Sequence, residues 1–232
     1  MAEPVVAVVV AAGAGVRLGG SVPKALRPLA DKPLVLHALE ALAAGGVRRA
    51  VVVIAPGAEQ DFETALARSP IPAGYVTGGS RRQDSVSEGL AALAGDPEAA
   101  LARFVLVHDA ARPLVPAAVV ARVISALEGG ADAVVPVVPI VDSVRALDAS
   151  GASRAIDRSE LRAVQTPQGF RADVLTDALA RAAAEGREVS DDATAVEAIG
   201  VPVVVVEGSP DALKITGPAD LPVAENILRG RE

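Results

Sequence analysis

Short apolar runs alternate with longer amphipathic stretches along most of the chain. The apolar runs are rich in valine and have no polar face, as expected of strands that helices cover on both sides. They lie at 5–10, 50–55, 104–108, 133–138 and 203–207. Helix-like segments, several with proline or acidic residues at the start and glycine at the end, lie at 33–46, 57–68, 82–95, 116–130, 171–186 and 191–200. This alternation predicts an α/β fold: a Rossmann-like, doubly wound, mostly parallel sheet with helices on both faces.

One segment breaks the alternation. Residues 140–165 carry short alternating runs around the turn-rich stretch 148-DASGAS-153, which is typical of a β-hairpin. We therefore expect a protruding arm at about 140–163, on a single domain that spans 1–232. Such an arm either covers a site or grips a partner subunit.

Composition narrows the class of protein. The chain has 232 residues, of which 51% are hydrophobic and 2% aromatic, which suits a buried sheet under alanine-rich helices. A net charge of −7 argues against broad binding to nucleic acid. The lack of cysteine excludes disulfides, thiolate metal sites and a cysteine nucleophile. No apolar run reaches the ~20 residues that span a bilayer, and the first run flows directly into a glycine turn, unlike a signal peptide. These features predict a cytoplasmic enzyme with no nucleic-acid or membrane partner.

The stretch 11-AAGAGVRLGG-20 follows the first predicted strand. Its glycines allow a tight turn whose N–H groups could cradle a phosphate, and Arg17 and Lys24 add positive charge. The spacing fits neither the dinucleotide-binding fingerprint nor the Walker P-loop. A plain strand-to-helix turn is the structural alternative, and the two basic residues weigh against it.

The stretch 78-GGSRRQDSV-86 has two readings. Gly79, Ser80, Arg82 and Ser85 could bind a base or an anion at a helix start. Equally, the glycines could serve a turn, Asp84 or Ser85 could cap the helix, and the arginines could lie on the surface.

In 105-VLVHDAARPLV-115, Asp109 follows a predicted central strand, where a carboxylate could hold Mg²⁺ beside nucleotide phosphates. The alternative is a helix-capping aspartate. We interpret His108 as a structural hydrogen-bonding residue, and expect Arg112 to orient the loop carboxylates or to pair with Asp109.

Lysine is scarce, with three residues against nineteen arginines. Lys24 and Lys214 therefore stand out as places that need a compact charge against phosphate, although compositional bias also thins lysine. The chain offers no cysteine and no Ser-His-Asp order, but a glycine loop, basic residues and one well-placed aspartate. These suit in-line displacement at phosphorus, which needs positioning and charge stabilisation and no protein nucleophile.

Taken in order, the motifs resemble those of the 2-C-methyl-D-erythritol 4-phosphate cytidylyltransferases of the non-mevalonate isoprenoid pathway. The motifs are AAGxGxR followed by PK, GGxxRxxSV, VHDAARP, DS before the arm, DR in the arm, TPQ and a late KIT. The resemblance runs from Ala11 to the segment 219–228. VHDAARP together with the first loop is specific to this family and its close relatives.

The resemblance implies transfer of CMP from CTP to methylerythritol phosphate with release of pyrophosphate, with Mg²⁺ or another divalent cation, in a homodimer joined through the arm. The implied catalytic residues are Arg17, Lys24, Asp109 and Lys214, with Asp109 also beside the metal. The implied CTP-binding residues are Ala12, Gly13, Ala14, Gly15, Gly79, Ser80, Arg82 and Ser85. The implied acceptor-binding residues are Asp109, Arg112, Ser143, Arg158 and Thr166, of which Ser143 and Arg158 would act across the dimer interface. Ser143 stands where the family often has threonine, and Ser80 where some members have an acidic residue.

Three other functions stay open at this point. A ribitol 5-phosphate cytidylyltransferase would share the CTP half of the site and differ in the acceptor half. A dinucleotide-dependent oxidoreductase would need a different glycine spacing and an acidic residue after the second strand. A non-catalytic nucleotide-sensing module would be expected to lack at least one of Arg17, Lys24, Asp109 and Lys214.

Overall fold

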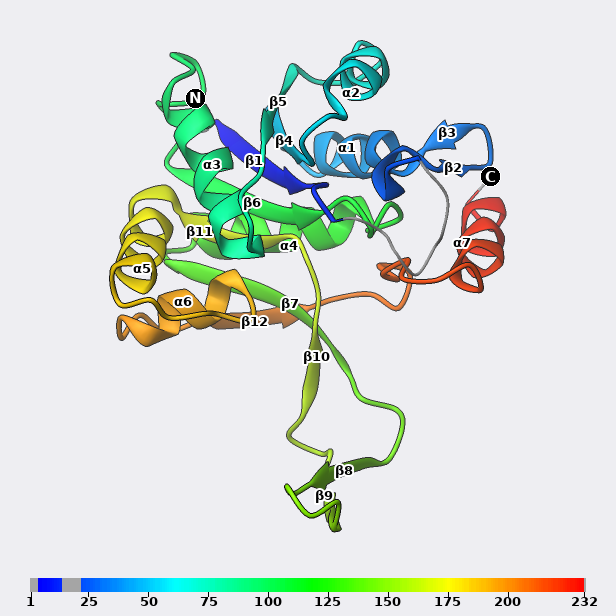
Figure 1. The fold of residues 1–232 in the computed structure, drawn as a ribbon, viewed down its shortest axis with the longest axis vertical. Helices are drawn as coiled ribbons and strands as arrows, with labels where there is room; N and C mark the ends of the chain where they lie inside the picture. The colour runs from blue at the N-terminus through cyan, green and yellow to red at the C-terminus, as the bar shows by residue number, and fades with distance from the viewer. Residues whose placement is uncertain (1–3, 14–21, 232) are drawn as a thin grey trace.

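The computed structural model describes residues 4–13 and 22–231 and confirms the predicted α/β fold with a mostly parallel sheet (Figure 1). The main sheet is formed by eight strands: β1 (Val5–Val10), β4 (Arg49–Ile54), β5 (Ala73–Thr77), β6 (Phe104–Asp109), β7 (Ala133–Pro139), β10 (Arg162–Val164), β11 (Gln168–Arg171) and β12 (Val204–Glu207). The helices are α1 (Leu34–Ala44), α2 (Glu59–Leu66), α3 (Arg82–Ala94), α4 (Ala117–Glu128), α5 (Ala172–Ala184), α6 (Asp192–Ala198) and α7 (Asp220–Arg229). A 3₁₀ turn, η2, covers Lys24–Leu26, and β2 (Pro28–Leu29) pairs with β3 (Lys32–Pro33).

The central part of the sheet is parallel. β1 lies between β4 and β6 and runs parallel to both, and β4 continues the parallel order to β5 at the edge. β11 runs antiparallel between β6 and β7, while β12 runs parallel to β7 on its other side. The carboxyl ends of β1, β4, β5 and β6 therefore meet at one edge of the sheet, where ligands bind in folds of this kind.

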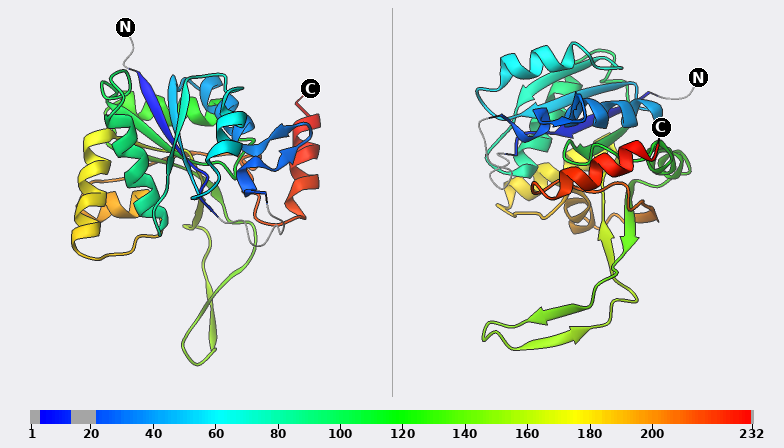
Figure 2. Two further views of the ribbon diagram at one scale, coloured as in Figure 1. Left: turned by 45° about the horizontal axis from the view of Figure 1, so that its top comes forward. Right: turned by 90° about the vertical axis from the view of Figure 1, so that its right-hand side faces the viewer.

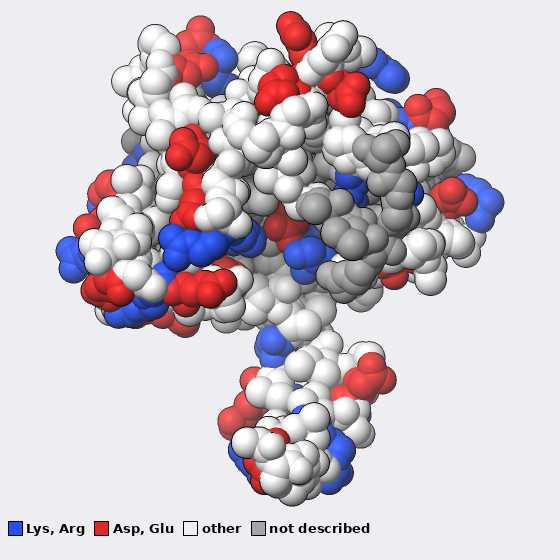
Figure 3. All heavy atoms as spheres, viewed as in Figure 1, with Lys and Arg blue, Asp and Glu red and all other residues white. Residues whose placement is uncertain are grey.

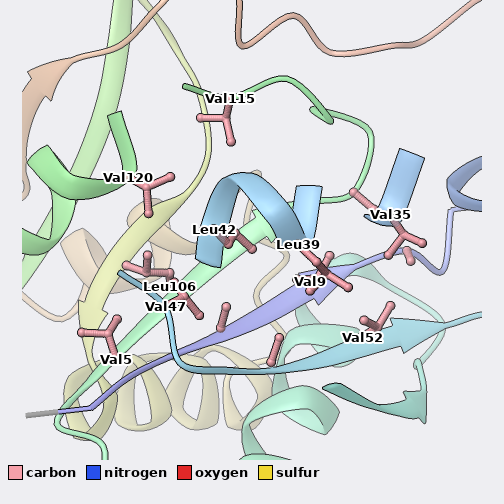
Figure 4. Close-up of a cluster of buried hydrophobic side chains, with 14 of the residues drawn as sticks. Val5, Val9, Val35, Leu39, Leu42, Val47, Val52, Leu106, Val115 and Val120 are labelled. Carbon is pink, nitrogen blue, oxygen red and sulfur yellow. The ribbon is translucent and has the colours of Figure 1, made fainter. Parts of the chain in front are cut away.

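The valine-rich strands bury both faces, as their composition predicts. Val5, Ala7 and Val9 of β1 pack in a cluster with α1, α2 and α4, part of which Figure 4 shows. Val6 and Val8 face the opposite way and pack in a second cluster with α3, α5 and α6. Successive side chains of a strand point to opposite faces, so one run of valines serves both helix layers.

The predicted arm is present. β8 (Val144–Leu147) and β9 (Ser153–Ile156) pair with each other in a separate two-stranded sheet, and the arm projects away from the main sheet (Figure 2). Its base is β10, which pairs with the end of β7. Val141 and Leu147 are 80% and 73% exposed, so the arm carries apolar side chains that this chain leaves uncovered.

The sequence prediction of the main sheet lacks two strands and misjudges a third, and it also lacks the short strands β2 and β3. β5 and β11 were not predicted, because β5 is a partly exposed edge strand and β11 begins with a glutamine and a glycine. The expectation that helices cover both faces of the last strand is wrong. Val204 and Val205 of β12 are 43% and 58% exposed, because β12 lies at the sheet edge.

The last helix, α7, packs away from the main sheet, beside the β2–β3 hairpin (Figures 1 and 2). Ala224 of α7 is buried in a third, small cluster with Leu29, Leu34, Leu114 and Ile215. Within the described ranges, no helix combines the length and the apolar character that crossing a bilayer requires.

Candidate active site

The loops at the carboxyl ends of the parallel strands enclose a cavity of about 630 Å³. That volume lies in the range of small-molecule sites. Basic and acidic side chains lie next to each other on this face of the molecule, above the arm (Figure 3). The cavity-lining residues include nine that the sequence singled out: Ala12, Gly13, Lys24, Gly79, Ser80, Arg82, Ser85, Asp109 and Lys214. Four separate sequence motifs thus converge on one site.

Some of the expected site residues are not in this lining set. Ala14, Gly15 and Arg17 lie outside the described residues. Arg112 and Thr166 do not line the cavity, and Ser143 and Arg158 belong to the arm and its base.

Asp109 is the centre of an ion-pair network. Its Oδ2 lies 2.7 Å from Lys214 Nζ, and its Oδ1 lies 3.6 Å from a guanidinium nitrogen of Arg82. Burial alone would raise the pKa of Asp109, but the positive charges of Lys214 and Arg82 hold it below the usual range. The side chain is therefore a carboxylate at neutral pH. No helix starts at this point, since α4 begins at Ala117, so the helix-cap reading of Asp109 is wrong.

The sequence reading missed Asp192, the first residue of α6. Its carboxylate is fully buried, and its Oδ2 accepts a 2.7 Å hydrogen bond from Arg82 Nη1. Burial raises the pKa of Asp192, and the charge of Arg82 opposes that rise. Arg82 thus lies between two carboxylates from different elements, which fixes its guanidinium at the cavity wall.

In the 78–86 segment the helix-cap reading is correct for Asp84, whereas binding of a base or an anion by Gly79, Ser80, Arg82 and Ser85 stays a prediction. The Asp84 carboxylate accepts hydrogen bonds from Arg81 N and Arg81 Nε, so these two residues cap α3. Ser85 is buried and donates to Arg81 O, and its side chain also faces the cavity. Arg82 is directed to Asp109 and Asp192, so it is not a surface arginine of the kind the alternative supposed.

His108 is a structural hydrogen-bonding residue, as predicted from the sequence. It is fully buried, its Nε2 donates to Arg112 O at 3.1 Å, and its Nδ1 accepts from Thr166 Oγ1 at 3.0 Å. Burial lowers the pKa of His108 to about 4, so it is neutral at physiological pH. Thr166 Oγ1 also accepts from Asp109 N at 3.0 Å. His108 and Thr166 together hold the backbone that carries Asp109.

The expected pairing of Arg112 with Asp109 is replaced by contacts to backbone carbonyls. Arg112 Nη1 donates to Ala212 O at 2.7 Å, and Nη2 donates more weakly to Val164 O at 3.3 Å. The ion-pair partners of Asp109 among the described residues are Arg82 and Lys214. Arg112 therefore ties the loop after β6 to the loop that carries Lys214 and to the base of the arm.

The arm residues do not reach the cavity of their own chain. Ser143 precedes β8 and is exposed, and Arg158 donates to Val141 O within the arm. Neither lines the cavity. This placement agrees with the expectation that they act in the site of a second copy, which stays a prediction.

A comparison with known proteins bears directly on this site. Residues 5–230 match the family model described as IspD, 2-C-methyl-D-erythritol 4-phosphate cytidylyltransferase. The chain belongs to this family. The enzyme of that name from Saccharopolyspora erythraea is 48% identical over 97% of this chain and 99% of its own length. The one from Nocardia farcinica is 45% identical over 98% of this chain and 95% of its own.

Solved structures of the family agree in fold. The 2-C-methyl-D-erythritol 4-phosphate cytidylyltransferase of Thermus thermophilus is 36% identical, with a TM-score of 0.77, over 99% of this chain and all of that one. The 4-diphosphocytidyl-2C-methyl-D-erythritol synthase of Anaerococcus prevotii is 25% identical, with a TM-score of 0.84, over 98% of this chain and 99% of that one.

Membership of the family makes the chain a cytidylyltransferase, an enzyme of the nucleotidyltransferase class. It supports the methylerythritol phosphate cytidylyltransferase reading over an oxidoreductase, a ribitol 5-phosphate cytidylyltransferase and a non-catalytic sensor.

Proposed function

We propose that this chain transfers the CMP group of CTP to the 4-phosphate of 2-C-methyl-D-erythritol and releases pyrophosphate. An oxygen of the acceptor phosphate attacks the α-phosphorus in line. The bond from the α-phosphorus to the bridging oxygen breaks, and pyrophosphate leaves with the electron pair. The observation that carries the proposal is the cavity of a family member in which Lys24, Arg82 and Lys214 line the wall around Asp109.

The side chains of the cavity suit this chemistry. Ala12 and Gly13 after β1, with Gly79, Ser80 and Ser85 after β5, form a small, uncharged part of the wall that fits a cytosine and a ribose. Lys24, Arg82 and Lys214 supply the positive charge for the phosphates and for the charge that develops in the transition state. Ala14, Gly15 and Arg17 lie outside the described residues, and their expected roles in CTP binding and catalysis stay predictions.

No general base is needed for this reaction. A phosphate monoester carries about 1.5 to 2 negative charges at pH 7, so the attacking oxygen is already deprotonated. The neutral and buried His108 is consistent with this, because it is committed to Arg112 O and Thr166 and leaves no nitrogen for a substrate. Catalysis then depends on holding two anionic groups in line and screening their repulsion.

The donor set fits a divalent cation that the nucleotide brings. The described residues contain no cluster of three or more metal-ligating side chains, and Asp109 is the one carboxylate among the described cavity-lining residues. Mg²⁺ in nucleotide sites is held by one or two carboxylates together with phosphate oxygens. Asp109 would hold Mg²⁺, or another divalent cation, which when bound neutralises phosphate charge.

We also propose that two copies of the chain pair through the arm. The proposal is supported by the exposed apolar side chains on the arm, and by Ser143 and Arg158, which are not among the described residues that line the cavity of their own chain. In a dimer these two residues would bind the acceptor in the partner's site. A cytoplasmic location and the absence of nucleic-acid or membrane partners rest on composition alone and stay predictions.

The reaction is tested by giving the purified protein CTP, Mg²⁺ and one acceptor at a time, and by measuring the release of pyrophosphate. We expect turnover with methylerythritol phosphate that exceeds turnover with ribitol 5-phosphate. Equal or greater turnover with ribitol 5-phosphate would overturn the proposed acceptor, and no release with either would overturn the proposed reaction.

A further inference from the structure

The C-terminal segment, made of α7 and the residues after it, contacts two loops that contribute to the cavity wall. Beyond the end of the helix, Arg231 Nη2 donates to Leu114 O at 2.7 Å and lies 3.1 Å from Asp211 Oδ2. Leu114 belongs to the loop after β6, the strand that ends at Asp109, and Asp211 belongs to the loop after β12 that carries Lys214. Ala224 of α7 is buried in a cluster that also contains Leu114 and Ile215, one residue from each loop.

At the other end of the helix, Asp220 is bonded to the segment that follows Lys214. One of its oxygens, Oδ2, accepts three hydrogen bonds: from Thr216 N at 2.6 Å, Thr216 Oγ1 at 2.9 Å and Gly217 N at 2.8 Å. These hydrogen bonds lower the pKa of Asp220, and the charge of Lys24 adds to the effect. The side chain is therefore an ionised carboxylate, and hydrogen bonds to an ionised group are about twice as strong as neutral ones.

The short segment 214–217 is thus held on two sides. Ile215 is fully buried, and its N–H donates to Ala111 O at 2.8 Å. Asp220 holds Thr216 and Gly217 from the other side. The Lys214 side chain itself is 43% exposed, so its position depends on this backbone anchor and on its pair with Asp109.

We infer that Asp220 is a positioning residue of the reaction, which holds the 214–217 segment so that Lys214 and Thr216 face the reacting phosphates. The inference rests on the proposed function. Asp220 does not line the cavity, so it acts through Lys214 and Thr216 and touches no substrate. A shift of about 1 Å in a group that aligns a reacting centre is enough to cost about 10²-fold in rate.

Steady-state kinetics of Asp220→Ala and Asp220→Asn give the first test. We expect Asp220→Ala to lower kcat/KM by about 10- to 10²-fold. Asp220→Asn keeps an acceptor oxygen and should recover most of the loss. Asp96→Ala is the matched control. The Asp96 carboxylate also accepts from two backbone N–H groups, of Glu98 and Ala99, but it does not line the cavity, and its removal should leave the kinetics unchanged.

A double-mutant cycle separates positioning from general loss of structure. If Asp220 acts mainly through Lys214, then Asp220→Ala in a Lys214→Ala background should lower kcat/KM by no more than about 3-fold, since coupled residues are not additive. Fully additive effects would overturn the inference.

The lysine signals give a readout that does not depend on turnover. The chain has three lysines, so a protein labelled with ¹³C at the lysine ε-carbon gives three signals, which the variants Lys32→Arg and Lys214→Arg assign. Asp220→Ala should move the Lys214 signal and leave the Lys32 signal in place. An unchanged Lys214 signal would overturn the inference. A wild-type protein without turnover would overturn the proposed function instead, and the spectra would still decide whether Asp220 holds Lys214.

Discussion

The contribution of the Arg82–Asp192 ion pair to stability can be tested directly, because the two partners belong to different elements of the fold, α3 and α6. Asp192→Ala removes a carboxylate that lies 2.7 Å from Arg82 and is fully buried. The substitution leaves the Arg82 guanidinium without its closest charge partner. The link between the start of α3 and the start of α6 is lost at the same time.

The expected loss of stability depends on how well the Arg82 charge is still solvated or paired once Asp192 is removed. Removing one partner of a fully buried ion pair costs about 3–5 kcal/mol. The side chain of Arg82 is 30% exposed and stays near Asp109, at 3.6 Å, so water and Asp109 will offset part of that cost. We expect the free energy of unfolding to fall by about 1–3 kcal/mol, and the melting temperature by about 3–10 °C for a chain of this size.

Urea denaturation of the wild type, Asp192→Ala and Asp192→Asn measures the effect. Asparagine keeps an oxygen that can accept from Arg82, so Asp192→Asn should cost less than Asp192→Ala. A change below about 0.5 kcal/mol for Asp192→Ala, the range of an ordinary surface substitution, would refute the reasoning.

The pH dependence gives a second, signed check on the same residue. Burial raises the folded-state pKa of Asp192 above its usual 3.8, so the folded protein holds this proton more tightly than the unfolded chain. Below pH 3.8 the carboxyl is protonated in both states and contributes no difference. Between pH 3.8 and the raised pKa the unfolded chain loses this proton while the folded protein keeps it, so the free energy of unfolding falls across that window and levels off above it. From about pH 4 upward, the free energy of unfolding of the wild type should therefore fall relative to that of Asp192→Asn. A relative rise of the wild type would contradict a raised pKa of Asp192.

Three further predictions concern packing, catalysis and the arm. Gly169→Ala would place a Cβ 2.4 Å from Val123 Cγ1 and should lower the free energy of unfolding by about 1–3 kcal/mol in urea, whereas Gly74→Ala, with no atom within 4 Å, should not. Lys24→Ala should lower turnover by ~10²-fold or more with the fold intact, and Lys32→Ala, which does not line the cavity, should not; near-normal turnover of a folded Lys24→Ala protein would reject its role. Deleting residues 148–153 should weaken dimerisation or acceptor binding more than CTP binding; an unchanged sedimentation profile and acceptor affinity would count against the arm proposal.

Four of the five strands that the valine runs predict lie inside the main sheet, and the fifth, β12, lies at its edge. β1, β4, β6 and β7 lie inside the sheet, so a run of valines is the direct record of their two covered faces. β11 is also buried but begins with Gln168. The side-chain amide of Gln168 donates a hydrogen bond to the Asp191 carboxylate and accepts one from Ala193 N. Because those partners lie more than 20 residues away, a satisfied buried glutamine cannot be told from a surface one in the sequence.

The residues of the site likewise differ in whether the sequence alone can predict them. Lys24, Asp109 and Lys214 lie in short motifs that follow predicted strands or loops, so their positions could be predicted at the strand ends. Asp192 pairs with an arginine 110 residues earlier, and beside it Asp191 caps α6 by accepting from Thr194 N. In the sequence the two aspartates look like one acidic first turn. In the structure Asp191 caps the helix, whereas Asp192 pairs with Arg82 at the cavity wall.

The charge of the cavity also could not be read from the overall composition. The chain carries a net charge of −7, which on its own would repel CTP and a sugar phosphate. The described residues that line the cavity include four basic side chains, Lys24, Arg81, Arg82 and Lys214, against the single carboxylate of Asp109. Fields in a cleft are set by the nearest charges, because charges more than about 10 Å away are screened at physiological salt. The acidic surface therefore does not conflict with an anionic substrate. The buried Asp192 limits the local excess of positive charge and ties up one edge of the Arg82 guanidinium, so that this charge is held in position before a phosphate arrives.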